Sequence, residues 1–251
     1  MKSSKRNSEY LQQVSDKETA VILEQLESAL RKAGRGENSE GDSNYVTGDV
    51  VEFGCYRGDT SLLIEKMLEE EGAKMNLWIY DSFEGLPART REDASAAGDG
   101  FSEGELFVSK REVVERFKKA GLRVPKIRKG FFGDLDPGEV KLGGSKLDGV
   151  ELNNGNQIGG EIVRSSNDLP DKIIFAFLDG DLYQSIKTSL NLVTPRLVCG
   201  TDGKCCSVII IHDYNNPKLP GVAKAVDEWM TKHQKTAPRL QRRESLAIIS
   251  W

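Results

Sequence analysis

The sequence predicts a doubly wound α/β fold, in which helices cover both faces of a mostly parallel sheet. Three observations lead to this prediction. Short apolar runs alternate with helical patterns along most of the chain, as they do in sheets built from β-α-β units. The first of these runs ends in a glycine-rich turn that leads into a helical pattern. The length of 251 residues suits one such domain with additions and allows a large core.

The chain begins with a polar stretch that is followed by a predicted helix. From Asp16, apolar residues recur at helical spacing, and Gly34 is expected to end this helix. Residues 34–44, GRGENSEGDSN, have the composition of a flexible linker. The sequence therefore predicts an N-terminal helix and linker over residues 1–46 and a main domain over residues 47–251.

The main domain alternates predicted strands with predicted helices. Runs typical of strands are GDVVEF (48–53), NLWIYD (76–81), KIRKGFF (126–132), KIIFAFLDGD (172–181), SVIIIHD (207–213), RLQRR (239–243) and SLAIISW (245–251). Helical patterns cover residues 60–72, 109–121, 183–197 and 221–233. Residues 137–170 are rich in Gly, Asn and Ser, so we interpret them as a polar surface insertion.

Composition and charge exclude several classes of protein. The net charge of -4 and the pI near 5.5 argue against nucleic acid as a partner, because phosphate binding needs a basic surface. No apolar run approaches the roughly 20 residues that span a bilayer, and the N-terminus lacks the apolar core of a secretory signal. The four cysteines show no zinc-site spacing, and only two histidines are present. We expect a cytoplasmic protein with reduced thiols and neither nucleic-acid nor membrane partners.

The turn after the first strand resembles a cofactor site without phosphates. In such sheets, ligands bind at the carboxyl ends of the strands. The turn has the form Glu52-x-Gly54-x-x-x-Gly58, and it lacks the third glycine of the motif that binds a pyrophosphate. An acid there could meet an ammonium group, and neighbouring donors a carboxylate, as S-adenosylmethionine requires. The candidate residues of this turn are Glu52, Gly54, Tyr56, Arg57, Gly58, Thr60 and Ser61; ordinary packing is the alternative for each glycine.

Two further strand ends supply candidates for the nucleoside half of a cofactor. Asp81 ends the second strand, where a carboxylate can accept hydrogen bonds from both ribose hydroxyls. A turn or helix-capping role is the alternative for this aspartate. Ser82, Phe83, Phe132 and Asp134 follow the second and third strands and are candidates for the adenine pocket, although either phenylalanine could belong to the core.

Acidic residues also follow the next two strands of the predicted sheet. Asp179 and Asp181 come after one apolar run, and His212 and Asp213 after the next. Buried charge beside such runs is costly unless it is paired or binds a metal. We expect Asp179 and Asp213 to bind a divalent cation: carboxylates suit Mg²⁺, whereas His212, if it joins them as a ligand, favours Mn²⁺ or another transition metal. For Asp181, a helix cap is the favoured interpretation.

This chemistry suits transfer of a methyl group to a hydroxyl. A cation bound to the acceptor oxygen lowers its pKa and fixes its direction toward a sulfonium methyl group. Asp179 is the first candidate for the base that takes the proton, and His212 is the second. A structural, hydrogen-bonded histidine is the alternative for His212.

The order of these motifs resembles the macrocin O-methyltransferase family, whose members methylate sugar hydroxyls with S-adenosylmethionine and Mg²⁺. The resemblance runs from about Gly48 to Trp251 without the insertion, through VEFGCYRGDTS, YDSFEGLP, KGFFGDL, LDGDLYQS and HDYNNPKLPGVAKAVDEW. It implies a Rossmann-like class I methyltransferase domain with seven strands, the last antiparallel, a small-molecule hydroxyl substrate and an expected homodimer. It also implies metal ligation by Asp179 and by the pair His212-Asp213.

One position departs from the family pattern. The family usually has Asp-Asp-Tyr where this chain has His212-Asp213-Tyr214, so the identity of the metal is open. Two alternative functions also stay open. An NAD-dependent oxidoreductase or epimerase could use the same glycine turn and Asp81. A protein that binds S-adenosylmethionine without turnover could retain the fold.

Overall fold

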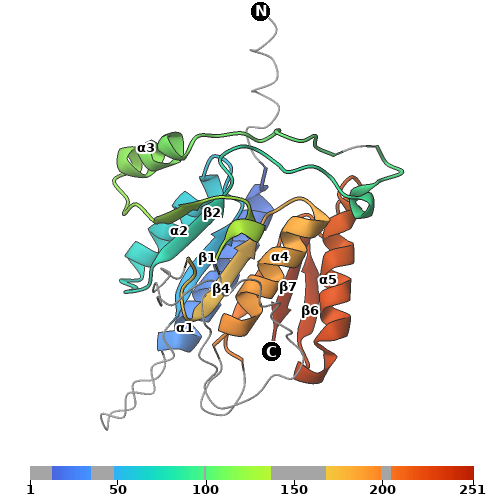
Figure 1. Cartoon of the computed structure of the whole chain (residues 1–251). Coiled ribbons are helices and arrows are strands. Elements are labelled where there is room, and N and C mark those ends of the chain that lie inside the picture. The colour runs from blue at the N-terminus through green and yellow to red at the C-terminus, as the bar shows by residue number, and fades with distance from the viewer. Residues whose placement is uncertain (1–12, 35–47, 99, 137–167, 199–204) are drawn as a thin grey trace, which may run out of the picture.

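The computed structural model describes residues 13–34, 48–98, 100–136, 168–198 and 205–251. Among these residues it has one seven-stranded sheet in the order β3-β2-β1-β4-β5-β7-β6 (Figure 1). The strands are β1 (Asp49–Phe53), β2 (Leu77–Asp81), β3 (Lys126–Lys129), β4 (Ile173–Leu178), β5 (Val208–Ile211), β6 (Arg239–Arg243) and β7 (Leu246–Ser250). Neighbouring strands from β3 to β5 are parallel, and β7 runs antiparallel to both β5 and β6. The predicted fold class is confirmed.

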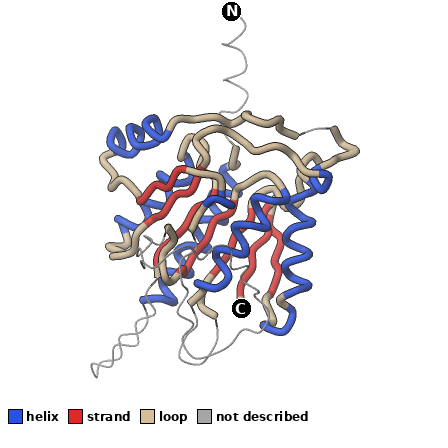
Figure 2. The backbone as a smooth tube through the Cα atoms, in the orientation of Figure 1, coloured by secondary structure: helices blue, strands red, loops and turns tan. Residues whose placement is uncertain are grey.

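Helices cover both faces of this sheet (Figure 2). They are α1 (Asp16–Gly34), α2 (Asp59–Glu70), α3 (Lys110–Ala120), α4 (Tyr183–Val193) and α5 (Pro220–Lys232), with single 3₁₀ turns at Arg91–Asp93, Phe132–Asp134, Thr194–Arg196 and Gln234–Thr236. Successive strand residues point to opposite faces. Val50, for example, packs in the core cluster that contains residues of α1, α2 and α3, whereas Val51 packs in the cluster that contains residues of α4 and α5.

The central strands are apolar on both faces because both faces are covered. All six residues of β4, IIFAFL, and all four of β5, VIII, are buried. Helix α1 belongs to the same core: Ile22 and Leu26 are fully buried in one cluster with Phe175 and Phe177 of β4. The predicted linker (34–44) lies almost entirely outside the described residues, and so does most of the predicted insertion (137–170).

Several element boundaries differ from the sequence prediction by a few residues, and two of these differences have a clear physical reason. The helix expected over residues 183–197 ends at Val193 and continues as a 3₁₀ turn that contains Pro195, which has no N–H for a helical hydrogen bond. The strand expected over KIRKGFF is only Lys126–Lys129, because Gly130 adopts a φ of 148° and Phe132 begins a 3₁₀ turn. Among the described residues, no helix combines the length and the apolar character of a membrane span.

Candidate functional site

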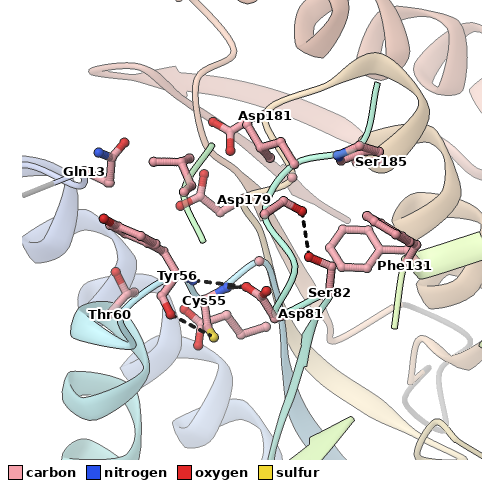
Figure 3. Close-up of a pocket in the computed structure, with 18 of the residues that line it drawn as sticks. Gln13, Cys55, Tyr56, Thr60, Asp81, Ser82, Phe131, Asp179, Asp181 and Ser185 are labelled. Carbon is pink, nitrogen blue, oxygen red and sulfur yellow. Dashed lines mark hydrogen bonds between the residues drawn. The ribbon is translucent and has the colours of Figure 1, made fainter. Parts of the chain in front are cut away.

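A pocket of about 540 Å³ lies at the carboxyl ends of β1, β2 and β4 (Figure 3). This is the edge at which the sequence places its candidate residues. Eight of the predicted cofactor residues line the pocket: Glu52, Gly54, Tyr56, Arg57, Thr60, Asp81, Ser82 and Phe132. Val14, just before α1, and Thr19, near the start of α1, line it as well. The structure therefore gathers most of the candidates around one cavity.

The turn after β1 depends on a close approach between two backbone segments. Gly54 has a φ of +86°, and a Cβ atom there would stand 2.0 Å from the backbone oxygen of Asp179. The Asp179 N–H also donates to the Phe53 carbonyl, at 2.8 Å. Only glycine fits this position without moving the backbone. The predicted cofactor turn is thus in direct contact with the loop that carries the predicted catalytic aspartate.

Asp81 connects the turn after β1 to the end of β2. Its Oδ2 accepts hydrogen bonds from the backbone N–H groups of Cys55 (3.0 Å) and Tyr56 (3.1 Å), and its Oδ1 accepts one from Phe83 (2.8 Å). The turn-stabilising role that the sequence left as an alternative is therefore present. A carboxylate has about four acceptor positions, so these three bonds leave capacity for a ligand hydroxyl.

Glu52 brings a buried carboxyl group to the floor of the pocket. It is 1% exposed, and its Oε2 accepts a hydrogen bond from the Ser61 hydroxyl. Burial raises the pKa of Glu52 to about 8; Asp179 and Asp81 add to this rise, and the bond from Ser61 opposes it. A cation placed beside Glu52 would reverse the effect and favour the charged carboxylate.

Four of the predicted cofactor residues do not line the pocket of the described structure. Gly58 precedes α2 with a φ of +78°, and Ser61 is buried beneath the pocket against Glu52. Phe83 packs in the core cluster with α3, which is the alternative that the sequence left open for it. Asp134 is exposed at the end of its 3₁₀ turn. Gly58 and Ser61 thus support residues that line the pocket without lining it themselves.

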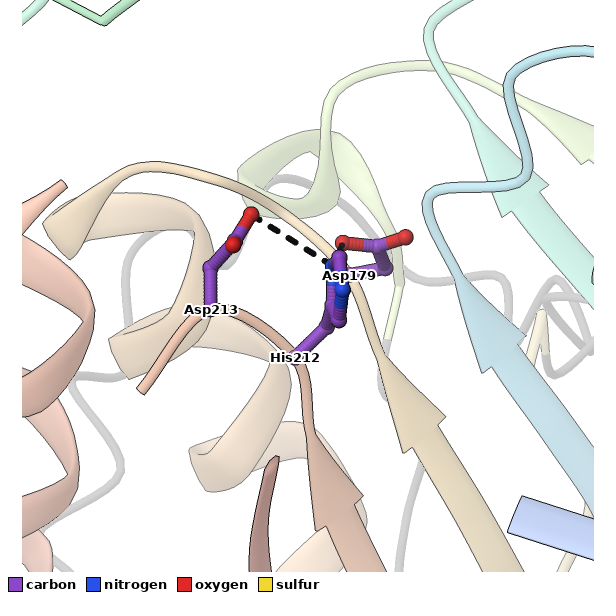
Figure 4. A group of neighbouring side chains, drawn as sticks. All are labelled: Asp179, His212 and Asp213. Atoms are coloured by element: carbon purple, nitrogen blue, oxygen red, sulfur yellow. Dashed lines mark hydrogen bonds and ion pairs between the residues drawn. The ribbon is translucent and has the colours of Figure 1, made fainter. Parts of the chain in front are cut away.

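Asp179, His212 and Asp213 come together beside the pocket (Figure 4). One potential ligand atom from each residue lies within 4.8 Å of the others. His212 Nδ1 is 2.9 Å from Asp179 Oδ1 and 3.4 Å from Asp213 Oδ2. Asp213 adopts a φ of +58°, a costly backbone conformation that directs its carboxylate toward the other two residues.

The spacing of these three groups fits a bound divalent cation. Two ligands at right angles around an ion bound at about 2.1 Å lie about 3.0 Å apart, close to the two distances from His212 Nδ1. Burial would lower the pKa of His212, but Asp179, Glu18 and Asp213 raise it to about 12. A cation at Nδ1 would therefore take the place of a proton.

Glu18 is a member of this group that the sequence interpretation missed. It lies in the first turn of α1, is 8% exposed, and places Oε1 3.7 Å from His212 Nε2. The interaction with His212 holds the pKa of Glu18 below its ordinary value, against the effect of burial. The capping sequence Ser15-x-x-Glu18 is visible in the chain, but it predicts only a helix start.

Asp181 also lines the pocket, and the helix-cap interpretation for it is wrong. The first N–H of α4, on Tyr183, donates instead to Asp93 Oδ1 at 2.7 Å. Asp181 has a φ of +57° and is 8% exposed. Burial, with the nearby charges of Asp179 and Asp213, raises the pKa of Asp181 well above its ordinary value. The pocket is therefore strongly acidic on the side that faces β4 and β5.

Comparison with known proteins assigns the chain to a family. The macrocin-O-methyltransferase (TylF) family model matches residues 24–149, about half of the chain. The chain belongs to the macrocin-O-methyltransferase family. The matched span contains the turn after β1, Asp81 and the third strand, and it ends before β4. The resemblance deduced from the sequence motifs is thereby confirmed.

Two curated relatives of this chain are named as O-methyltransferases. One is the 8-demethyl-8-(2,3-dimethoxy-alpha-L-rhamnosyl)-tetracenomycin-C 4'-O-methyltransferase of Streptomyces olivaceus, 28% identical over 176 residues, covering 67% of this chain and 54% of the relative. The other is the demethyldecarbamoylnovobiocin O-methyltransferase of Streptomyces niveus, 26% identical over 196 residues, covering 75% of this chain and 60% of the relative. The chain thus matches little more than half the length of these relatives.

Solved structures with the same fold include two methyltransferases. The O-methyltransferase NovP superposes with a TM-score of 0.62 at 22% identity, covering 93% of this chain and 79% of NovP. The calicheamicin methyltransferase CalS11 superposes with a TM-score of 0.61 at 17% identity, covering 95% of this chain and 81% of CalS11. At this identity the likeness shows the fold, and the fold agrees with the family.

Proposed function

We propose that this protein is an S-adenosylmethionine- and divalent-metal-dependent O-methyltransferase that acts on a hydroxyl group of a small molecule. One observation carries the proposal: Asp179 belongs to both halves of the site. Its backbone lies against Gly54 of the predicted cofactor turn, and its carboxylate lies 2.9 Å from His212 in the acidic cluster. A methyl donor held by the turn and an acceptor oxygen held at the cluster would therefore be neighbours.

Each end of the pocket suits a different part of S-adenosylmethionine. Asp81 has remaining capacity for a ribose hydroxyl at the end of β2, and Phe132 offers an aromatic face for the adenine. Glu52 supplies a buried carboxylate for the ammonium group of the methionine moiety, while Arg57 and Thr60 can meet its carboxylate. These assignments need no phosphate contact, which agrees with the two-glycine form of the turn.

Asp179, His212 and Asp213 are the proposed ligands of the cation. When bound, the cation would make the acceptor hydroxyl more acidic and fix its direction. Asp179 then holds two roles, as a ligand and as the base that takes the hydroxyl proton, because it both belongs to the cluster and lines the pocket. The imidazole of His212 favours Mn²⁺ or another transition metal over Mg²⁺. His212 is the alternative base.

The acceptor is proposed from the chemistry of the relatives. The Streptomyces olivaceus relative is named for the 4'-hydroxyl of a methylated rhamnosyl group, and the Streptomyces niveus relative for a novobiocin precursor. A sugar hydroxyl on a secondary metabolite is therefore the first acceptor class to test.

We also propose that the protein works in the cytoplasm, in line with the buried and unbridged Cys55. A homodimer and the division at residue 46 stay predictions.

A methyl-transfer assay with S-[methyl-³H]adenosylmethionine tests the function. The panel contains sugars, glycosylated polyketides and glycosylated aminocoumarins, each with Mn²⁺, with Mg²⁺ or with EDTA. Transfer that requires a metal supports the proposal. Calorimetric binding of S-adenosylmethionine without transfer to any acceptor would favour a non-catalytic binding protein. Binding of NADH in place of S-adenosylmethionine would favour the oxidoreductase.

A further inference from the structure

The carboxylate of Glu18 joins the N-terminal helix to the proposed metal site from outside the pocket. Glu18 belongs to the first turn of α1, whereas His212 follows β5 near the middle of the sheet. Their nearest atoms, Glu18 Oε1 and His212 Nε2, are 3.7 Å apart, and both residues are largely buried, with exposed fractions of 8% and 5%. Water therefore has little access to the interaction between them.

Both oxygens of this carboxylate are held in place by other residues. Oε2 accepts hydrogen bonds from the Ser15 backbone N–H (2.8 Å) and the Ser15 hydroxyl (2.6 Å). The bond from the Ser15 N–H forms a helix capping box with the bond that the Glu18 N–H donates to the Ser15 hydroxyl (3.3 Å). Oε1 accepts a hydrogen bond from the hydroxyl of Ser245, which lies between β6 and β7. The position of Glu18 is thus fixed by two separate parts of the fold, and Oε1 remains directed at His212.

The two nitrogens of the His212 ring face different partners. Nδ1 lies between the carboxylates of Asp179 and Asp213, at 2.9 Å and 3.4 Å, whereas Nε2 lies 3.7 Å from the Glu18 carboxylate. An imidazole binds a metal through one nitrogen when the other nitrogen donates its N–H to an oriented acceptor. A carboxylate is the strongest such acceptor, because it also makes the ligating nitrogen more basic.

We infer that Glu18 is a positioning residue for the proposed metal site: its carboxylate, 3.7 Å from Nε2 of His212, favours the ring orientation and tautomer in which Nε2 carries the hydrogen and Nδ1 faces a transition-metal cation held with Asp179 and Asp213. This inference rests on the proposed function, because it assigns a role within the same site. It also gives the N-terminal helix a direct part in metal binding. Glu18 touches neither the pocket nor the reacting atoms, so it is not a catalytic residue.

Calorimetric titration of the purified full chain with Mn²⁺ tests this inference. Glu18→Gln keeps the capping box, since glutamine serves at that position, but removes the negative charge. The matched control is Glu27→Gln on the same helix, where an exposed glutamate pairs with Arg31. We expect Glu18→Gln to weaken Mn²⁺ binding about tenfold or more. The control variant should bind Mn²⁺ as the wild type does, and both variants should retain their affinity for S-adenosylmethionine.

The outcomes separate the two claims. Wild-type protein that does not bind Mn²⁺ overturns the metal site itself. Wild-type protein that binds Mn²⁺, with Glu18→Gln binding it within about twofold, overturns the role of Glu18 alone and leaves the metal site standing. If Glu18→Gln does not fold, Ser245→Ala replaces it as the variant. Loss of that hydroxyl should weaken Mn²⁺ binding severalfold, and unchanged affinity would likewise contradict the inference.

Discussion

The backbone oxygen of Asp179 packs directly against Gly54, so the turn after β1 and the loop after β4 are held in one fixed arrangement. A side chain at position 54 would have its Cβ atom 2.0 Å from that oxygen. A hydrogen bond from the Asp179 N–H to the Phe53 carbonyl, at 2.8 Å, joins the same two segments. Any change that moves the cofactor turn therefore moves the aspartate that we propose as ligand and base.

Gly54→Ala should destabilise the protein and abolish binding of S-adenosylmethionine. The added methyl group meets a backbone atom rather than a flexible side chain, and the φ of +86° is itself strained for alanine. We expect a loss of more than about 2 kcal/mol in the free energy of unfolding. Gly72→Ala is the matched control: Gly72 has a φ of +62°, but nothing lies within 4 Å of its Cβ position. Chemical denaturation and calorimetry of both variants measure the difference.

Asp179→Asn should remove methyl transfer while cofactor binding remains. The amide keeps the size of the side chain but neither carries the charge for a cation nor takes a proton from a hydroxyl. We expect the rate of transfer to fall at least about 100-fold. The affinity for S-adenosylmethionine should stay within a fewfold. Asp171→Asn, an exposed change just before the same strand, is the control. A large loss of cofactor affinity in Asp179→Asn would mean that the metal site is misplaced.

His212→Asp should shift the metal preference of the site toward Mg²⁺. A third carboxylate provides the oxygen ligands that Mg²⁺ prefers, but it repels Asp179, Asp213 and Glu18 when no cation is bound. The metal-free variant should therefore melt at a lower temperature than the wild type, and Mg²⁺ should raise its melting temperature by more than in the wild type. Equal Mg²⁺ effects on the two proteins would show that His212 is structural.

Glu52 should make the stability of the cofactor-free protein fall as the pH rises. Its pKa is 4.5 in the unfolded chain and about 8 when buried, so the folded state holds this proton more tightly. The stability that Glu52 contributes is complete below about pH 4.5 and is lost as the pH rises through about 8. Glu52→Gln should flatten this slope.

Thermal melts across this pH range measure the effect of Glu52. The control is Glu70→Gln, which changes an exposed residue of α2. Bound S-adenosylmethionine should also flatten the slope in the wild type, because its ammonium group favours the charged carboxylate. If the slope of Glu52→Gln equals that of the wild type, Glu52 does not titrate in this range.

The strands were predictable because burial on both faces leaves a plain apolar signal. β4 and β5 read as strands for that reason, and the residues after them were expected at one edge of the sheet. The weaker edge strand β3, with Lys126 and Arg128, was predicted too long because its apolar extension, Phe131 and Phe132, belongs to the following turn.

The partners of the site residues were not predictable in the same way. Periodicity identifies the face that a residue occupies, but not the residue that it meets across the fold. Asp93 replaces Asp181 at the start of α4 although it lies far away in the chain. Glu18 reaches His212 from the opposite end of the sequence. Phe83 is turned into the core by a φ of +50°, which no pattern of residue types indicates.

The pairing of β1 with β4 has a consequence for how the protein folds. These neighbours in the sheet are separated along the chain by α2, β2, α3 and β3, so their contact closes a very long loop. Such contacts form slowly, because closing the loop costs chain entropy before the contacts contribute any stabilising energy. A newly made chain would therefore be able to bind ligands only after β1 and β4 have paired. A small molecule that binds at the junction would therefore stabilise the folded state against the unfolded chain.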